Sequence, residues 1–471
     1  MTRMWSPFPE FNNENHVEYV VIFAKLLIPG RGDPIPKGAV GISTKDGSIY
    51  YVGPQSKLPQ TLQSTPPTHV NYLLPGLWDC HTHFAGTLQA DFPAFVQTHP
   101  AACGAAIARG FYDTLMAGFT SVRDVGSFAI EAYSAVKAGL ILGPTVFGAG
   151  GAIGITGGSC DAVTLPTDWM YGRQGVQQHN QWPGISTLVL ADGVDECRRA
   201  VRLQIRRGAS CIKVVTTGGV MSTADNPEYR QYSDAELDAV INEATLQGRS
   251  VAAHAHGKAG IMASIKLGAS TIEHGSYLDE EAAELMREKG VTLVSTRHIV
   301  EAGLSRLDKM PPETSAKMVA IAGKHLDAYR IAVRTGIKIA LGTDICSSDP
   351  KETISHGNNG HELVWAVKKA GMTPLGAIEA ATANSAETLG LQAPKKGIIK
   401  EGWDADMIAL DENPLENIDV FAKPENIKYV WQGGKQVKSP QASHWPPPTS
   451  ETNGWSVVDK HECVGCQVSG L

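Results

Sequence analysis

Short β-branched, apolar runs alternate with longer amphipathic stretches through the middle of the chain. Eight such runs are predicted strands: NYLLPGLWDCH, FTSVRDVG, TVFGAG, SCIKVVTTGG, SVAAHAHG, STIEHGS, VTLVSTRH and IKIALGTD. Strands that alternate with helical stretches are typical of a parallel α/β sheet. Eight repeats of this unit predict an α/β fold of the (β/α)₈ TIM barrel type.

Two of the intervening helices have clear start signals. Ser233-Asp-Ala-Glu236 has the spacing of a capping box, in which the serine and the glutamate satisfy each other's backbone amides. Thr373-Pro374 places an N-cap residue before a proline at the first helical position. We therefore expect helices to begin directly after Ser233 and Thr373.

Both ends of the chain are rich in strand patterns. The runs VEYVVIFAKLLIPG, GAVGIS and SIYYVG lie near the start, and ADMIAL and IKYVWQGGKQV lie near the end. We expect these flanks to form one small β-sandwich domain. The predicted organisation is residues 1–72 for the first part of the sandwich, 73–394 for the barrel and 395–438 for the second part. Residues 439–471 are rich in Ser, Pro, Asn and Gly, a composition that favours an extended or disordered arm.

The composition excludes several classes of partner. With 41 basic and 48 acidic residues the net charge is -7, which gives no electrostatic basis for binding nucleic acid or an anionic membrane. The first twenty residues lack the apolar core of a secretory signal, and no uninterrupted apolar run is long enough to span a bilayer. We expect a cytoplasmic protein that acts on a small molecule.

The eight cysteines are scattered, so they do not indicate the disulfide framework of a small secreted domain. Cys463-Val-Gly-Cys466 in the tail has a spacing that could bind a metal or form a disulfide. A single pair of this kind is a weak signal, and we favour a tail without chemistry.

The first candidate site residues are His81 and His83, which end the first predicted barrel strand. Alternate side chains of a strand share a face, so both imidazoles can point at one ion. Two such histidines are as often structural as ligands. Their position favours ligands, because active-site groups of barrels gather at the carboxyl ends of the strands.

Four further polar residues lie in or directly after later strands. They are Lys213 in CIKVV, His254 in VAAHAHG, His274 in TIEHG and Asp344 in ALGTD. Each alone has an ordinary structural interpretation, as a surface lysine, a core histidine or a helix cap. Six such residues on five strands of one barrel are improbable by accident.

The set is chemically coherent as a metal site. Imidazoles and a carboxylate suit zinc or a similar divalent ion. A lysine buried among cations loses its proton readily, and a neutral amine can take up carbon dioxide. Carboxylated Lys213 would then bridge two divalent metal ions as an anion.

These residues, in this order, resemble the metal-dependent amidohydrolase superfamily over nearly the whole chain. GRGDPIPKGAVGIS and GIIKEGWDADMIALDENPLENI resemble the flanking signatures of its imidazolonepropionase-like and Xaa-Pro dipeptidase-like branch. Within that branch, GLWDCHTHF, THPAACGA, ADGVDECRRAVRLQIRRGA, GGVMSTADNPEY, HGKAGIMASIK and GMTPLGAIEAATAN are most similar to the ochratoxinase-type fungal members.

The resemblance implies a role for each ligand. It places His81, His83 and Asp344 on one metal and His254 and His274 on the other. Carboxylated Lys213, which is N6-carboxylysine, and a hydroxide would bridge the two ions. Lys213 and Asp344 would be the catalytic groups, with Asp344 passing the proton of the attacking water to the leaving nitrogen. His256 would lie near the substrate, or else support the site from the core.

The resemblance also implies hydrolysis of an amide bond that releases an amino acid. The substrate would be an N-acyl amino acid, a dipeptide or an ochratoxin-like amide, and the candidates for binding its α-carboxylate are Tyr229, Arg230, Tyr232 and Arg297. Arg123 is predicted to form an ion pair inside the scaffold instead. The family further implies a homo-oligomer, such as an octamer.

Two departures from the family leave the substrate open. Gly157-Gly158-Ser159 stands where relatives have Gly-Gly-His, and SHGNNGHELVWAV resembles the dipeptidase members. One alternative is a cyclic amide or imidazolone hydrolase, which needs no free α-carboxylate on its substrate. A second is a catalytically inactive oligomeric scaffold, but all six ligands are present, which argues against it.

Overall fold

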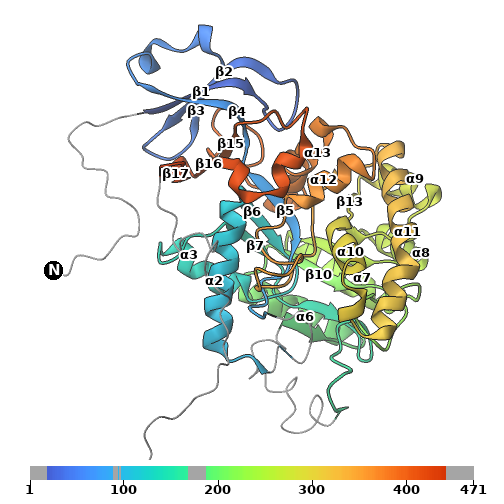
Figure 1. Cartoon of the computed structure of the whole chain (residues 1–471). Helices are drawn as coiled ribbons and strands as arrows, with labels where there is room; N and C mark the ends of the chain where they lie inside the picture. Colours follow the sequence, from blue (N-terminus) through green and yellow to red (C-terminus); the bar gives the residue numbers. More distant parts are fainter. Residues whose placement is uncertain (1–18, 89–93, 95–96, 168–186, 442–471) are drawn as a thin grey trace, which may run out of the picture.

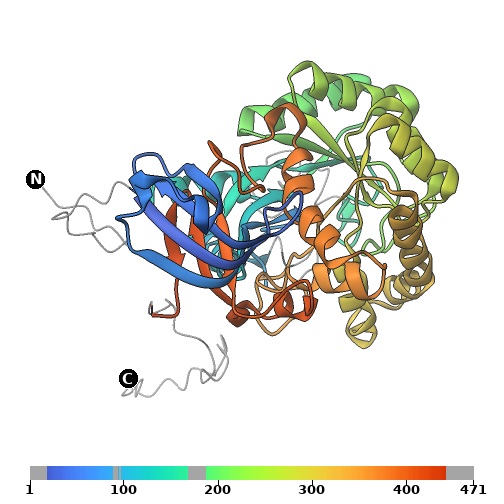
Figure 2. The same cartoon turned by 90° about the horizontal axis from the view of Figure 1, so that it is seen from above.

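The structure is a computed structural model that describes residues 19–88, 94, 97–167 and 187–441. The predicted Cys463–Cys466 pair and nearly all of the predicted C-terminal arm lie outside these residues. Figures 1 and 2 show a β-rich part beside a larger part, in which parallel strands are covered by helices.

The β-rich part is one seven-stranded sheet made from both ends of the chain. Its strands are β1 (Tyr19–Leu27), β2 (Ile35–Ser43), β3 (Ile49–Pro54), β4 (Pro67–Pro75), β15 (Met407–Leu410), β16 (Ile427–Gln432) and β17 (Lys435–Lys438). They lie in the order β17-β16-β15-β4-β1-β2-β3. The ends meet where β4 pairs antiparallel with β15, with Pro75 opposite Met407. Gly433 and Gly434 both have positive φ, as the tight turn between β16 and β17 requires.

Alternation of side chains gives this sheet two buried faces. Ile22, Val40 and Trp431 belong to a core within the β-rich part. Their neighbours on the opposite face, such as Ile408 and Val430, pack in one cluster with residues of the helical part. The sheet is therefore fastened to the larger part by a continuous apolar contact.

The larger part contains two parallel sheets. One has the order β5-β6-β7, and the other has the order β14-β13-β12-β11-β10-β8-β9. The strands are β5 (Leu77–Thr82), β6 (Phe119–Asp124), β7 (Thr145–Gly148), β8 (Ala152–Gly154), β9 (Leu188–Leu190), β10 (Cys211–Val215), β11 (Ser250–Ala255), β12 (Thr271–His274), β13 (Thr292–Val294) and β14 (Ile339–Ala340). The prediction of parallel strands alternating with helices is confirmed.

Backbone hydrogen bonds link both edge strands of the three-stranded sheet, β5 and β7, to the longer parallel sheet and its flanking segments. The amide of Ser210, next to β10, donates to Gly148 of β7 over 2.8 Å. The amide of Cys80 in β5 donates to Leu341 over 2.8 Å, and that of Asp344 donates to His81 over 2.7 Å. These bonds bring the segment after β14 against the carboxyl end of β5.

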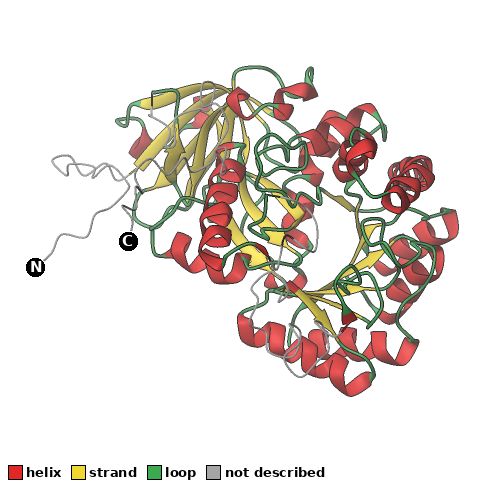
Figure 3. Ribbon diagram, turned by 60° about the horizontal axis from the view of Figure 1, so that its bottom comes forward, coloured by secondary structure: helices red, strands yellow, loops and turns green. Residues whose placement is uncertain are grey.

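Helices cover the outside of the parallel strands (Figure 3). They are α2 (Pro100–Met116), α3 (Ala129–Lys137), α6 (Val194–Arg207), α7 (Asp234–Leu246), α8 (Lys258–Leu267), α9 (Glu280–Lys289), α10 (Arg297–Leu304), α11 (Pro312–Thr335), α12 (His361–Lys368), α13 (Pro374–Ala380) and α14 (Ala383–Glu387). The capping box at Ser233 and the Thr373 cap are confirmed. No helix within the described ranges is long and apolar enough to cross a membrane.

Candidate metal centre

All six predicted ligands line one cavity of about 200 Å³. His81 and His83 come from the end of β5 and the residue after it, and Lys213 comes from β10. The others are His254 in β11, His274 at the end of β12 and Asp344 after β14. The carboxyl ends of the parallel strands thus bring together side chains that lie far apart in the sequence.

The first ligand group consists of His81, His83 and Asp344. Their nearest ligand atoms all lie within 4.8 Å of one another. The Nε2 atom of His83 is 3.1 Å from Asp344 Oδ1, and the Nε2 atom of His81 is 3.6 Å from the same oxygen. Two imidazole nitrogens and a carboxylate oxygen converge here on one point.

The second group consists of His254, His256 and His274, which also lie within 4.8 Å of one another by their ligand atoms. The His274 ring lies close to both of its partners, with centroid distances of 4.6 Å to His254 and 4.8 Å to His256. It also lies 4.8 Å from the His81 ring, so the two groups are adjacent.

Lys213 lies against the first group, with Nζ 3.3 Å from His81 Nε2. Burial lowers the pKa of Lys213 to about 8, although the charges of Glu273 and Asp344 oppose this shift. A substantial fraction of the amine is therefore neutral near pH 8, the form that reacts with carbon dioxide.

Contacts to Nδ1 orient several of the rings. His81 Nδ1 is 2.7 Å from the buried Glu273 carboxylate, and His83 Nδ1 is 3.0 Å from the Gly126 carbonyl oxygen. His274 Nδ1 is 2.8 Å from the Thr296 hydroxyl. Fixing Nδ1 in this way leaves Nε2 free to act as a metal ligand.

The Glu273 carboxylate also holds Arg123, whose Nη2 donates to Oε1 over 2.7 Å. Neither side chain is exposed. The predicted role of Arg123 in an internal ion pair is confirmed. The pair matters for the site because the same carboxylate orients the His81 ring.

The titration behaviour suits metal binding. Burial lowers the pKa of His81 to about 4 and that of His254 to about 3, so both imidazoles are neutral at pH 7. Burial alone would raise the pKa of Asp344, but interactions with His81 and His83 outweigh it and lower that pKa to about 2. Neutral imidazoles and an ionised carboxylate are the forms that coordinate a cation.

Backbone strain is concentrated at the site. His274, Thr296 and Asp344 have φ values of 69°, 56° and 63°, in the left-handed region that non-glycine residues rarely adopt. Such conformations persist where the surrounding structure imposes them, often at functional sites. Here the strain aims two candidate ligands and the hydroxyl that supports one of them.

The four predicted carboxylate-binding residues do not join this arrangement, and none is among the described residues that line the cavity. Tyr229 is 70% exposed, and Arg230 pairs with Asp234. The Tyr232 hydroxyl is buried and donates to the Ala191 carbonyl oxygen. The Arg297 guanidinium is occupied by Glu301, the Ala322 carbonyl and His325. His256, in contrast, lines the cavity.

The residues that support the ligands were not predicted from the sequence. Glu273 directly precedes His274 in TIEHG, and an acidic residue inside an apolar strand was a signal that could have been used. Asp79 accepts hydrogen bonds from Thr343 and Asn359 and thereby joins β5 to the segment after β14. Burial raises the pKa of Asp79 to about 6.

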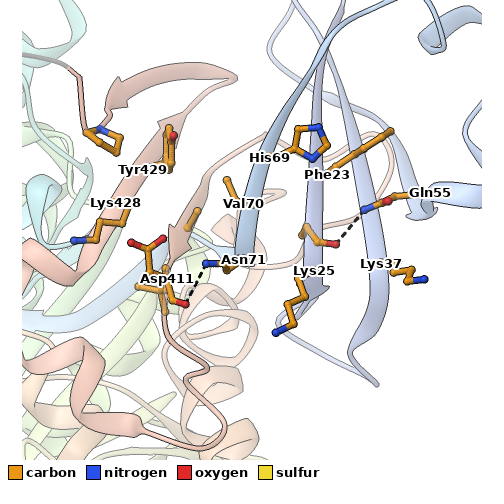
Figure 4. A pocket seen from close by; sticks show the side chains of 14 residues that line it. Phe23, Lys25, Lys37, Gln55, His69, Val70, Asn71, Asp411, Lys428 and Tyr429 are labelled. Atoms are coloured by element: carbon orange, nitrogen blue, oxygen red, sulfur yellow. Dashed lines mark hydrogen bonds between the residues drawn. The ribbon is translucent and has the colours of Figure 1, made fainter.

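A second hollow of about 560 Å³ lies on the seven-stranded sheet of the β-rich part (Figure 4). Lys25, Lys37, His69, Asp411 and Tyr429 are among its lining residues. It shares no lining residue with the metal cavity, and neither candidate metal group of the described residues lies in it.

The fold and the donor set define a class of protein. The chain belongs to the amidohydrolase family, whose model matches residues 72–437. It is 46% identical to ochratoxinase of Aspergillus niger over 438 residues, which is 92% of this chain and 89% of that protein.

Comparison with solved structures gives the same result. The crystal structure of A. niger ochratoxinase superimposes with a TM-score of 0.82, covering 90% of this chain and 96% of that one. A Xaa-Pro dipeptidase with methionine bound in its active site is 31% identical, with a TM-score of 0.77, and 89% of this chain and 100% of that one are covered. A shorter similarity, 27% over 154 residues, covers 31% of this chain and 36% of the imidazolonepropionase of Thermoplasma volcanium. The chain is therefore a hydrolase of the amidohydrolase family.

Proposed function

We propose that the protein is a metal-dependent hydrolase that cleaves an amide C–N bond and releases an amino acid. The observation that carries this proposal is the pair of ligand groups that face one cavity, with Lys213 against them. We further propose that the two parallel sheets are parts of one (β/α)₈ barrel, whose strand ends supply the ligands.

The residues present fit two divalent ions. His81, His83 and Asp344 would hold one ion, and His254 and His274 would hold the other, with His256 beside them. Lys213, once carboxylated, would offer an oxygen to each ion. The set contains nitrogen and oxygen donors and no thiolate, which suits zinc. When bound, the ions would polarise the scissile carbonyl and lower the pKa of water toward 7.

Asp344 would move the proton in this reaction. Its lowered pKa of about 2 keeps the carboxylate ionised at neutral pH, so it can accept the proton of the attacking water. Because Oδ1 lies 3.1 Å from His83 Nε2, the carboxylate stays beside the reacting centre. It would then deliver the proton to the leaving nitrogen.

The comparisons support the substrate class. One relative is named for ochratoxin and a solved structure is named for Xaa-Pro dipeptides, and the dipeptidase structure has methionine bound in its active site. We therefore favour N-acyl amino acids, dipeptides and ochratoxin-like amides as substrates.

A cyclic amide or imidazolone hydrolase is the second candidate function. It is favoured by the lining of the cavity, which among the described residues contains no arginine and only Lys213 as a lysine. A substrate without an α-carboxylate would need no further cation there.

An amide panel tests the proposal. The metal-loaded protein should release free amino acid from ochratoxin A, N-acyl amino acids or dipeptides, and release should stop on chelation and return with added zinc. Asp344→Asn should lower kcat by at least about 100-fold because general base catalysis is lost. Asp327→Asn, on the exposed surface of α11, is the matched control. Cleavage of ring amides alone would favour the second candidate, and no cleavage of any amide would contradict both.

A further inference from the structure

One wall of the metal cavity is apolar. Val220 and Met221 belong to the segment that follows β10, Val300 belongs to α10, and Met318 and Ile321 belong to α11. Val220, Val300, Met318 and Ile321 form one buried cluster. The cavity therefore combines an apolar surface with the candidate ligands, and a substrate group beside the scissile bond could contact that surface.

Lys317, the residue before Met318, holds this wall from α11. Its ammonium group donates to the Gly219 carbonyl over 2.8 Å, to the Asp225 carbonyl over 2.8 Å and to Asp225 Oδ1 over 3.2 Å. An ammonium group has three donors, so all of them can be used in these contacts. Gly219 itself lines the cavity and directly precedes Val220.

Asp225 completes the clamp from the same segment. Its Oδ2 accepts from the Gly219 amide over 3.0 Å and from Gln231 Nε2 over 3.0 Å, and its Oδ1 accepts from Ser222. The side chains of Lys317 and Asp225 are only 16% and 9% exposed. A charge pair so shielded from water is stronger and more specific in geometry than one on the surface.

The clamped segment also reaches the candidate ligands. The Gly218 carbonyl lies 3.3 Å from His254 Nε2. The segment that carries Val220 and Met221 therefore borders the candidate ligands at Gly218.

We propose that Lys317 and Asp225 are positioning residues that fix this wall as the subsite for a bulky apolar group next to the scissile amide. The inference rests on the proposed function and names its substrate class. Neither residue touches the ligands, so the pair acts through Gly219 and Val220.

Lys317→Met keeps the length of the side chain but loses the charge, and Asp225→Asn loses the charge at constant size. For amides with a large apolar group, each variant should lower kcat/KM by about ten-fold, mainly through KM, because contacts in an apolar pocket are lost. Amides with only small groups should change by less than about two-fold. Lys324→Met, which changes an exposed lysine of the same helix, is the matched control and should leave kcat/KM unchanged for amides with large and with small groups.

The panel should vary the two sides of the amide separately, with glycine against phenylalanine on the amine side and acetyl against naphthoyl on the acyl side. If a variant loses the preference for the large group on one side of the amide only, the group on that side is the one that contacts the apolar wall. An equal decrease in the kcat/KM of the variants for small and large substrates, or no decrease for either, would overturn the proposal.

A binding experiment on the wild-type protein separates this inference from the proposed function and does not depend on whether the variants fold. In calorimetry with the zinc-loaded protein, affinity should rise along glycine, alanine, leucine and phenylalanine or along acetate, butyrate and naphthoate. Affinity independent of apolar size in both series would overturn the subsite even if amides are cleaved. A rise with size in a protein that cleaves no amide would support the apolar subsite while the proposed hydrolysis fails.

Discussion

At the scale of single residues, the site depends on groups that hold the ligands as much as on the ligands themselves. Glu273, Gly126 and Thr296 each contact the Nδ1 atom of one histidine. Such partners fix the tautomer and orientation of the ring, and their loss commonly costs about 10–100-fold in metal affinity. The supporting residues therefore offer tests that leave every ligand in place.

Thr296 gives the cleanest of these tests. Thr296→Val keeps the shape of the side chain but removes the hydroxyl that lies 2.8 Å from His274 Nδ1. We expect metal affinity, measured by competition with a chromophoric chelator, to fall by about 10–100-fold. Thr296→Ser keeps the hydroxyl and should bind metal within a few-fold of the wild type. Equal affinities for the valine variant and the wild type would refute a supporting role.

His325, which belongs to neither ligand group, gives a test of pH dependence. Its Nε2 lies 2.6 Å from the Ser295 carbonyl, which it can reach only as a donor, so Nδ1 accepts from Arg297 at 3.3 Å. Burial, followed by the charge of Arg297, lowers the pKa of His325 to about 3. Protonation of Nδ1 would place a second cation against the guanidinium.

The sign of the effect follows from this lowered pKa. Between about pH 6.5 and 3 the unfolded chain binds a proton at His325 that the folded chain does not, so stability falls as the pH falls. His325→Gln should reduce the slope of the unfolding free energy against pH by up to about 1.4 kcal/mol per pH unit in this window. Denaturant unfolding of the metal-free protein at several pH values measures the slope. Identical slopes for the variant and the wild type would show that His325 takes up its proton in the folded protein over the same pH range as in the unfolded chain.

The candidate metal site was largely predictable at this scale because its donors break apolar strands in a recurring pattern. Lys213 and His254 stand out from CIKVV and VAAHAHG. The positions of the candidate carboxylate-binding residues were not predictable, because Tyr229 and Arg230 lie in a loop whose path depends on contacts from other segments. Arg297 illustrates the difficulty. Glu301 lies one turn further along the same helix, but His325 becomes a neighbour of Arg297 only because α11 packs against α10.

At the scale of elements, local signals predicted helix starts better than strand ends. The capping box at Ser233 is present, with Glu236 Oε2 accepting from the Ser233 amide over 3.0 Å. The third predicted strand, TVFGAG, is shorter than predicted, because β7 ends at Gly148, and β8, which begins at Ala152, lies beyond the predicted run. β9 was not predicted, because a three-residue strand gives too short a pattern to recognise.

Ser233→Ala should test the contribution of one element. Loss of the cap leaves an amide at the start of α7 without its partner and should lower the free energy of unfolding by about 1 kcal/mol. Amide hydrolysis should be unaffected, since Ser233 does not line the cavity. Ser134→Ala, at an exposed position within α3, is the control and should change stability by less than about 0.5 kcal/mol. Equal effects of the two substitutions in denaturant unfolding would show that the cap contributes little.

At the scale of the whole molecule, the family and the parallel α/β architecture were predictable because both arise from repeated patterns. The pairing of β4 with β15 joins segments more than 330 residues apart in the chain. Strand patterns at the two ends suggested this association, but the register depends on which faces are buried after folding. The apolar wall was not anticipated, because it combines α10, α11 and the segment after β10.

We propose that the carboxyl ends of five strands assemble two metal sites in one chain. Elemental analysis of the purified, zinc-saturated protein measures the number of ions that these sites hold. We expect two ions per chain, and about one in each of His83→Asn and His254→Asn, because each substitution removes a donor from only one group. His69→Asn, which changes an exposed histidine of β4 in the β-rich part, should retain two ions per chain. Less than one ion per chain in the wild type, or the same metal content in all four proteins, would contradict the account.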